Sequence, residues 1–174
     1  MNVVLFGFKG CGKTFVGRAL AARLGLAFVD TDKVLEEAYF ESKGKRLSFR
    51  EIAKKHGMTF FRLLEKRAVQ KAAILDEKVI ACGGGTPLSP GNVAALKRNG
   101  RLVLLTLAKE TLLERILAEG MPAFFDEKNP NASFEKIFNE RARYFEEIAD
   151  LKIDCDGKSS MQVMEEIVEK LGKP

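Results

Sequence analysis

The sequence predicts an α/β fold built on a mainly parallel β-sheet. Five short apolar runs, most of them continuous rather than alternating, are typical of strands that are buried on both faces. Longer stretches with helical spacing separate these runs, which is the pattern of a parallel sheet with helical crossovers. The expected strands cover residues 3–6, 27–30, 79–82, 101–107 and 152–155.

Helix signals fill the intervals between the strands, and the 174 residues suit one domain with a single core. Ser48 and Glu51 have the spacing of a capping box, which predicts that a helix begins there. Ser89 offers an N-cap, Pro90 a proline in the first turn and Gly100 a stop. The expected helices cover residues 14–24, 49–57, 59–75, 89–100, 133–149 and 160–172.

Composition limits the possible functions. A net charge of +5 fits anionic ligands, a nucleic-acid partner or a solvated surface with interspersed charges. Cys11, Cys82 and Cys155 form no CxxC pair, and with one histidine, His56, a zinc site is not expected. Free thiols, the lack of a signal-peptide pattern and the lack of a long apolar run predict a cytoplasmic protein that does not bind membranes.

The stretch from Gly7 to Thr14, "GFKGCGKT", matches the phosphate-binding pattern G-x-x-x-x-G-K-[ST] between an expected strand and an expected helix. Glycines allow the backbone to curl so that its N–H groups point at phosphate oxygens, and the helix N-terminus adds its dipole. Lys13 would reach the β- and γ-phosphates, and the Thr14 hydroxyl would bind Mg²⁺. The alternative is a plain glycine-rich turn.

Two carboxylates follow the second expected strand, at Asp30 and Asp32. In an extended segment they would project to the same side, at the sheet edge where open α/β proteins bind ligands. Asp30 would then hold Mg²⁺, directly or through water, and Asp32 would accept a proton from an attacking hydroxyl. The alternative is an Asx turn that caps the next helix.

Three more features are candidates for ligand contact. The glycines at 83–85 follow the third expected strand and favour a close approach of backbone to a ligand, although a flexible turn is the simpler reading. Arg62 and Arg141 lie on expected helices, and arginine recognises carboxylates with two parallel hydrogen bonds. Each arginine could instead be a surface residue, and Arg62 could simply pair with Glu65 three positions later.

Taken together and in this order, the motifs resemble those of shikimate kinase. They are "GFKGCGKT", "FVDTD", "FFRLLE", the "GGG" at 83–85 and "ERARYFEEIAD" at 140–150. The phosphate loop is shared by many families, but the combination is much more specific. The resemblance runs from about residue 1 to residue 170.

The resemblance implies the three-layer P-loop kinase fold, with a five-stranded parallel sheet flanked by helices and a mobile lid. The segment 119–133, which contains Gly120, Pro122 and Pro130 and shows no periodicity, would be that lid. Residues 1–174 would form a single domain, with residues 36–72 as the shikimate-binding part. The core would comprise residues 1–35, 73–118 and 134–174.

The activity that the resemblance implies is transfer of the γ-phosphoryl group of ATP to the 3-hydroxyl of shikimate, with Mg²⁺ as cofactor. Lys13 would contact the transferring phosphate, and Thr14 and Asp30 would hold the metal. Asp32 would bind the shikimate hydroxyls and act as the base. Shikimate and ATP would be the partners of a monomer, in the biosynthesis of chorismate and aromatic amino acids.

The remaining site residues follow from the same resemblance. Arg62 and Arg141 would clamp the shikimate carboxylate, and Gly83, Gly84 and Gly85 would line its pocket. Arg115 and the loop around Lys158 would lie near adenine. The nucleotide phosphates would meet Lys9, Gly10, Cys11, Gly12, Lys13, Thr14 and Phe15.

The chain departs from the family pattern at two positions. Met121 stands where the lid of the family carries an arginine that reaches the ATP phosphates, and methionine cannot donate a hydrogen bond to phosphate. Lys9 or Lys128 could substitute for that cation. Phe145 stands where the family commonly has tyrosine.

Three other functions remain possible from the sequence. One is a kinase of the same fold with another small acceptor, such as gluconate. A second is a GTP-dependent switch, because "DCDG" at 154–157 matches D-x-x-G, although no N-K-x-D motif follows. A third is a nucleic-acid-binding ATPase, although the chain has no evident nucleic-acid-binding motif.

Overall fold

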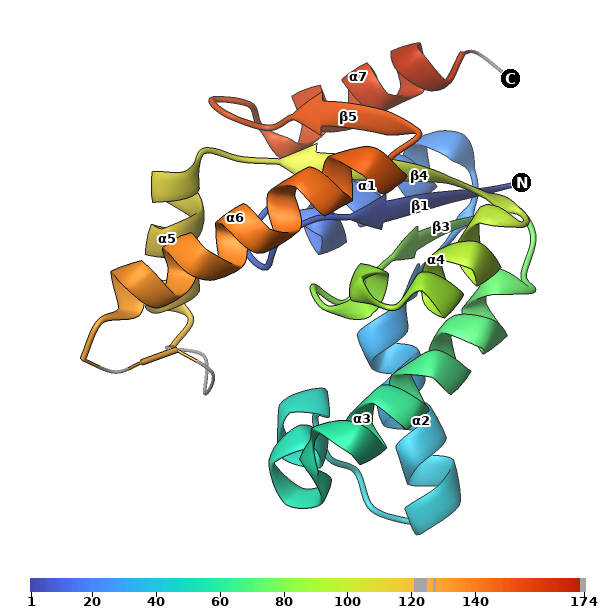
Figure 1. Cartoon of the computed structure of the whole chain (residues 1–174). Helices are drawn as coiled ribbons and strands as arrows, with labels where there is room; N and C mark the ends of the chain where they lie inside the picture. The colour runs from blue at the N-terminus through green and yellow to red at the C-terminus, as the bar shows by residue number, and fades with distance from the viewer. Residues whose placement is uncertain (121–124, 127, 173–174) are drawn as a thin grey trace.

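A computed structural model describes residues 1–120, 125–126 and 128–172. Its centre is a sheet of five parallel strands in the order β2-β3-β1-β4-β5 (Figure 1). The α/β fold and its parallel sheet are therefore confirmed, and every strand lies within one residue of its expected bounds. The strands are β1 (Asn2–Phe6), β2 (Ala27–Asp30), β3 (Lys78–Ala81), β4 (Gly100–Thr106) and β5 (Leu151–Asp154).

Helices connect the strands. Five of them, α1, α3, α4, α6 and α7, overlap the expected ones, and a short 3₁₀ helix, η1 (Thr86–Leu88), follows the triple glycine. The α-helices are α1 (Lys13–Leu24), α2 (Thr31–Lys43), α3 (Phe49–Ala73), α4 (Pro90–Lys97), α5 (Lys109–Ala118), α6 (Pro130–Ile148) and α7 (Ser160–Leu171).

The strands are apolar on both faces because helices cover both sides of the sheet. On one face, side chains of α1, α5 and α7 pack against residues such as Leu5 and Leu105. On the other face, α4 and the C-terminal parts of α3 and α6 pack against residues such as Val4 and Leu104. Alternate residues of a strand thus enter opposite cores, which makes the three-layer architecture.

Helices α2 and α3 form a second, smaller core beside the sheet. Figure 1 shows both helices extending away from the strands and lying side by side. Their buried contacts include Leu35, Tyr39, Ile52, Phe61 and Leu64. The part of the chain expected to bind the acceptor therefore has its own apolar cluster.

Local signals explain most helix boundaries. The capping box is present: the Ser48 side chain accepts from the N–H of Glu51, whose carboxylate accepts from the N–H of Ser48. Residues 49–57 and 59–75, expected as two helices, form the single element α3 with a break at Gly57, where φ is 79°. Ser89 precedes α4 without a capping hydrogen bond from its side chain.

Three expectations about helices were incomplete. Neither α2 nor α5 was among the expected helices, since α2 buries only one side chain per turn and α5 is short. Helix α6 begins inside the segment that was expected to be irregular. Asn129 caps it by accepting from the N–H of Ala132, and Pro130 occupies the first turn.

In the described ranges, no helix is both long enough and apolar enough to cross a lipid bilayer.

Replacing Gly17 with alanine should destabilise the fold. Gly17 lies in α1, and a Cβ there would come within 2.6 Å of Phe28 Cε2 and 3.3 Å of Leu5 Cδ1. We expect Gly17→Ala to lower the free energy of unfolding, measured by urea denaturation, by roughly 1 to 3 kcal/mol, because the added methyl group would overpack the core. Gly91→Ala is the matched control, since Gly91 is exposed in α4 and its Cβ would meet only Ser89 Oγ at 3.9 Å. Equal stability of the two variants would contradict the prediction.

Candidate active site

The candidate site lies at the carboxyl ends of β1, β2 and β3. The parallel register places Leu5 of β1 and Asp30 of β2 on either side of Ala81 in β3. The loops that follow these strands, which carry the phosphate motif, Asp32 and the triple glycine, therefore begin at one edge of the sheet. Strand β1 also pairs with β4, so the phosphate loop leaves the middle of the sheet. Open α/β folds bind ligands at such an edge.

The phosphate loop has the curled backbone that its sequence predicts. Gly7, Gly10 and Gly12 all have positive φ, and Gly12 is the N-cap of α1. A Cβ at Gly7 would overlap the carbonyl oxygen of Leu105, so this position excludes side chains. Lys13 Nζ donates to the carbonyl oxygens of Gly7, at 3.1 Å, and Phe8, at 2.8 Å, which holds its charge over the loop.

Thr14 and Asp30 face one another at the start of α1. Thr14 Oγ1 lies 3.5 Å from Asp30 Oδ2, and Asp30 Oδ1 accepts from the N–H of Asp32 at 2.9 Å. Asp30 is thus the N-cap of α2, as the capping alternative held. The expectation that both carboxylates project from an extended segment was wrong, because Asp32 lies in the first turn of α2. A hydroxyl beside a carboxylate still suits Mg²⁺, which takes its other ligands from phosphate and water.

Asp32 is packed against the triple-glycine loop. A Cβ at Gly83 would lie 2.5 Å from Asp32 Oδ1, and the N–H of Gly83 donates to Thr31 Oγ1 at 2.9 Å. Burial, followed by the negative charges of Asp30 and Glu65, raises the pKa of Asp32 from 3.8 to about 7, although Lys13 acts in the opposite direction. A carboxyl that titrates near neutral pH is suited to accept a proton.

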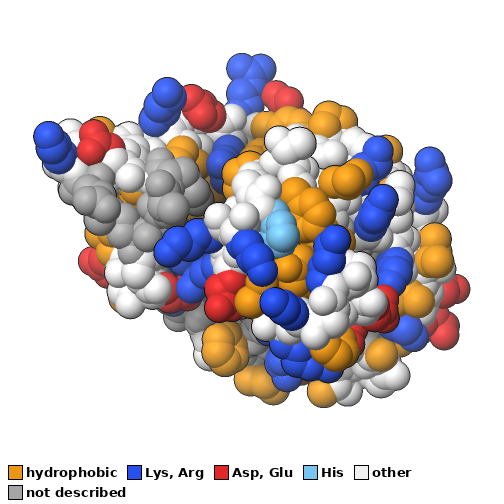
Figure 2. Space-filling view, turned by 90° about the horizontal axis from the view of Figure 1, so that it is seen from below, with side chains coloured by type: hydrophobic (Ala, Val, Ile, Leu, Met, Phe, Trp, Pro, Cys, Tyr) orange, Lys and Arg blue, Asp and Glu red, His pale blue; other side chains and the backbone are white. Residues whose placement is uncertain are grey.

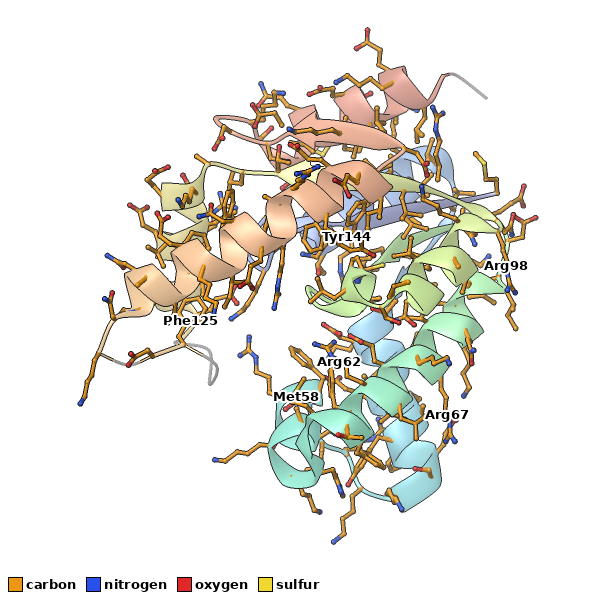
Figure 3. The ribbon with its side chains drawn as sticks, viewed as in Figure 1. Met58, Arg62, Arg67, Arg98, Phe125 and Tyr144 are labelled. Carbon is orange, nitrogen blue, oxygen red and sulfur yellow. The ribbon has the colours of Figure 1, made fainter. Side chains whose placement is uncertain are left out.

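Arg62 is held in place by a buried carboxylate. Arg62 Nη1 donates to Glu65 Oε2 at 2.8 Å, while Glu65 Oε1 accepts from Thr86 Oγ1 at 3.1 Å. The pairing of Arg62 with Glu65 is therefore real, but the guanidinium also lies against the glycine loop: a Cβ at Gly85 would be 2.7 Å from Arg62 Nη2. Figure 3 shows Arg62 on the side of α3 that faces the sheet and α6.

Arg141 on α6 lies across from the same loop region. It lines a pocket together with Leu88, Pro90, Glu140 and Tyr144. Burial lowers the pKa of Arg141, and the positive charge of Arg62 lowers it further. Two guanidinium groups that are close enough to lower the pKa of one of them favour an anion between them.

Among the expected adenine contacts, Arg115 touches the phosphate loop and Lys158 does not. Arg115 Nη1 donates to the carbonyl oxygen of Gly10 at 3.0 Å. Lys158 Nζ donates to the carbonyl oxygen of Asp154 at 2.8 Å and pairs with Glu166 at 2.7 Å.

Side chains of the phosphate loop itself differ in exposure. Cys11 is buried, so only its backbone can meet a phosphate, and Phe15 of α1 is 75% exposed. Lys9 pairs with Glu119 at 3.2 Å. Met121 lies outside the described residues, and Lys128 is exposed.

The net charge of the chain is concentrated in the expected shikimate-binding part. Residues 36–72 contain ten Lys and Arg against five Asp and Glu, so that this part alone accounts for the net charge of +5. Figure 2, seen from below, shows Lys and Arg side chains gathered on the face where α2 and α3 lie in Figure 1. Such a face attracts anions to the site by long-range electrostatics.

Several residues that shape the site were not singled out in the sequence. Thr31 accepts from the N–H of Gly83 and Thr86 donates to Glu65, and Glu65 was considered only as a partner of Arg62. The position of Thr86 directly after the glycines was a usable signal. The contact between Thr31 and Gly83 joins residues 52 positions apart, and no signal in the sequence pointed to it.

Comparison with known proteins identifies the family. A family model described as shikimate kinase matches residues 9–172. The shikimate kinase of Caldanaerobacter subterraneus subsp. tengcongensis is 38% identical over 167 residues, which cover 96% of this chain and 94% of that protein. That of Moorella thermoacetica is 38% identical over 170 residues, with 98% and 94% covered.

Solved structures agree in fold. Shikimate kinase from Acinetobacter baumannii in complex with shikimate superposes with a TM-score of 0.86 at 26% identity, covering 98% of this chain and 92% of that one. Shikimate kinase from Aquifex aeolicus gives 0.80 at 28% identity, covering 98% and 96%. With a match over nearly its whole length and relatives at this identity, the chain belongs to the shikimate kinase family.

Proposed function

We propose that the protein transfers the γ-phosphoryl group of ATP to the 3-hydroxyl of shikimate, giving shikimate 3-phosphate and ADP. The observation that carries the proposal is the packing of Asp32 against Gly83, between the charge of Lys13 and the loop that meets Arg62. A proton acceptor, a phosphate-binding loop and an arginine that can bind a carboxylate are thereby brought together in one place. Family membership supports the choice of shikimate over gluconate as acceptor.

Arg62 and Arg141 orient the acceptor in this proposal. They come from different helices, α3 and α6, and bind the carboxylate of shikimate between them. Glu65 fixes the guanidinium of Arg62 through a 2.8 Å ion pair, and Glu65 is itself bonded to Thr86. Because the side chains are held before the substrate arrives, the acceptor hydroxyl is delivered to Asp32 with little loss of entropy. Gly83, Gly84 and Gly85 line this pocket.

Asp32 takes the proton of the attacking hydroxyl. Its pKa of about 7 lets a fraction of the molecules carry the ionised form at neutral pH while the carboxylate remains basic enough to accept a proton. Loss of that proton makes the oxygen a better nucleophile as the bond to the γ-phosphorus forms and the bond to the β-phosphate oxygen breaks.

The phosphate loop binds and polarises the donor. Backbone N–H groups of residues 10–14, at the N-terminus of α1, cradle the phosphates, and Lys13 neutralises charge on the transferring group. Thr14 and Asp30 would hold Mg²⁺, which offsets negative charge on the β- and γ-phosphates. Arg115, beside Gly10, and Lys158 would approach the adenine.

The organisation of the chain completes the proposal. Residues 36–72, with their own core, form the shikimate-binding part, and residues 119–133 form the lid that excludes water during transfer. The enzyme acts as a monomer in the cytoplasm.

The first test is ADP release from ATP and Mg²⁺ with and without shikimate. We expect release to depend on shikimate and to yield phosphoshikimate by mass spectrometry, because two arginines orient the carboxylate of shikimate in the proposed site. Gluconate and nucleoside monophosphates are the control acceptors. Release that is equally fast without any acceptor, or that responds to gluconate instead, would refute the proposal.

Arg141→Ala should weaken shikimate binding selectively. Loss of one charge-assisted contact is expected to raise KM for shikimate by about 10- to 100-fold while KM for ATP changes by less than about twofold. Steady-state kinetics with each substrate varied measures both values. Arg143→Ala is the control, since Arg143 is 89% exposed and pairs only with Glu147 among the described contacts. An equal rise in both KM values would contradict the proposal that Arg141 binds shikimate.

Asp32→Asn should inactivate the enzyme and stabilise the fold at neutral pH. The folded chain keeps a proton on Asp32 up to about pH 7, whereas the unfolded chain loses this proton near pH 4. The free energy of unfolding of the wild type therefore decreases as the pH rises from about 4 to about 7. The variant has no such loss. Because each pKa unit is worth about 1.4 kcal/mol, we expect the variant to be more stable than the wild type by roughly 4 kcal/mol at pH 8 and by much less at pH 4. Phosphoryl transfer should fall by about 100-fold or more.

Urea denaturation at both pH values measures the stability difference. Glu169→Gln, an exposed change on α7, is the control that should alter neither stability nor activity. A stability difference that is the same at pH 4 and pH 8 would show that the carboxyl is not the cause.

A further inference from the structure

Lys9 stands where the phosphate loop meets the substrate loop. It is the third residue of the phosphate motif and directly precedes Gly10. A Cβ at Gly84 would lie 3.5 Å from the backbone nitrogen of Lys9 and 3.8 Å from its Cβ. The backbone of Lys9 thus borders both the loop that cradles the donor phosphates and the loop that lines the acceptor pocket. Phosphoryl transfer takes place between these two loops.

Helix α5 brings a carboxylate to the Lys9 side chain. Its face formed by Leu112, Arg115 and Ile116 lies over Gly10: a Cβ there would be 3.3 Å from Arg115 Cβ and 3.9 Å from Ile116 Cγ1. Glu119, the C-cap of α5, lies one turn beyond Arg115 on this face. Its Oε2 accepts the ammonium of Lys9 at 3.2 Å.

The same carboxylate oxygen has a second cation near it. Arg50 Nη2, in the first turn of α3, lies 3.6 Å from Glu119 Oε2. If Lys9 leaves, Glu119 keeps a positive partner and is not left as an unpaired charge.

We propose that Lys9 is a phosphate-binding residue for the γ-phosphoryl group, and that it exchanges Glu119 for this group when ATP binds. This inference deepens the proposed function, on which it rests for the identity of the donor. Both side chains of the Lys9–Glu119 pair are partly exposed, at 34% and 52%, so the pair is weak. A terminal phosphoryl group carries more negative charge than one carboxylate and lies in a less hydrated site. The ammonium therefore moves to the phosphate, where it offsets charge during transfer.

The test compares binding of ADP with binding of a non-hydrolysable ATP analogue by calorimetry in the presence of Mg²⁺. We expect Lys9→Met to weaken binding of the analogue about 10-fold and to leave ADP binding within about twofold, because only the analogue has a γ-group. The kcat for shikimate should fall by about 100-fold, and Lys9→Arg should restore most of it. Glu119→Gln removes the competing carboxylate and should tighten analogue binding.

Lys97→Met is the matched control. Lys97 is 38% exposed and forms a comparable ion pair with Asp150, at 3.1 Å. It lies on the opposite face of the sheet from α1, the helix that follows the phosphate loop. We therefore expect Lys97→Met to leave the binding of both ADP and the analogue unchanged. The proposal is overturned if Lys9→Met weakens ADP and the analogue equally, if it weakens neither, or if Lys128→Met has the selective effect instead. Binding is measured without acceptor, so a failure to phosphorylate shikimate would refute the proposed function and leave this result interpretable.

Discussion

Strand β1 is hydrogen-bonded along both edges, to β3 and to β4, and the location of the site depends on this pairing. Because both ladders are parallel, the loops after β1 and β3 must leave the sheet at the same end. The curled phosphate loop then adjoins the triple glycine, and β2, paired with β3, brings Asp30 and Asp32 to the same place. A slip of one residue in these ladders would turn apolar side chains such as Val4 and Leu5 toward the wrong cores.

The site combines groups that oppose one another electrostatically. Burial, followed by the charges of Asp30 and Glu65, raises the pKa of Asp32, and burial, followed by the charge of Arg62, lowers the pKa of Arg141. Both changes favour the uncharged form of the group. Arrangements of this kind reduce the stability of the fold and are retained where ligands of opposite charge complete them. A phosphate site with a cationic metal beside Asp30 and a carboxylate beside the arginines would do so.

Much of the fold could be predicted from the sequence, because its signals are local. Continuous apolar runs located the five strands within one residue, and the capping box at Ser48 located the start of α3. The phosphate loop was predictable for the same reason, since Gly7 to Thr14 are adjacent in the chain. Helix α2 was harder, because Asp30 reads equally well as a metal ligand and as a cap; in the structure it is a cap that also faces Thr14.

Contacts between distant segments could not be predicted in this way. The hydrogen bonds from Thr86 to Glu65 and from Gly83 to Thr31, and the pairs that Glu119 makes with Lys9 and Arg50, depend on how the helices dock. Spacing in the sequence carries no information on that docking. Family resemblance, on the other hand, predicted that Arg62 and Arg141 serve one site, which neither arginine suggested alone.

The separate core of α2 and α3 has an evolutionary consequence. Its apolar cluster, around Tyr39 and Ile52, is distinct from the two clusters that stabilise the sheet. In the proposed division of the chain these helices bind the acceptor, so substitutions that reshape the acceptor side can accumulate in them while the packing beneath the phosphate loop is conserved. Such an arrangement lets a lineage of kinases change its acceptor and keep its donor, because selection can act on the two halves of the reaction independently.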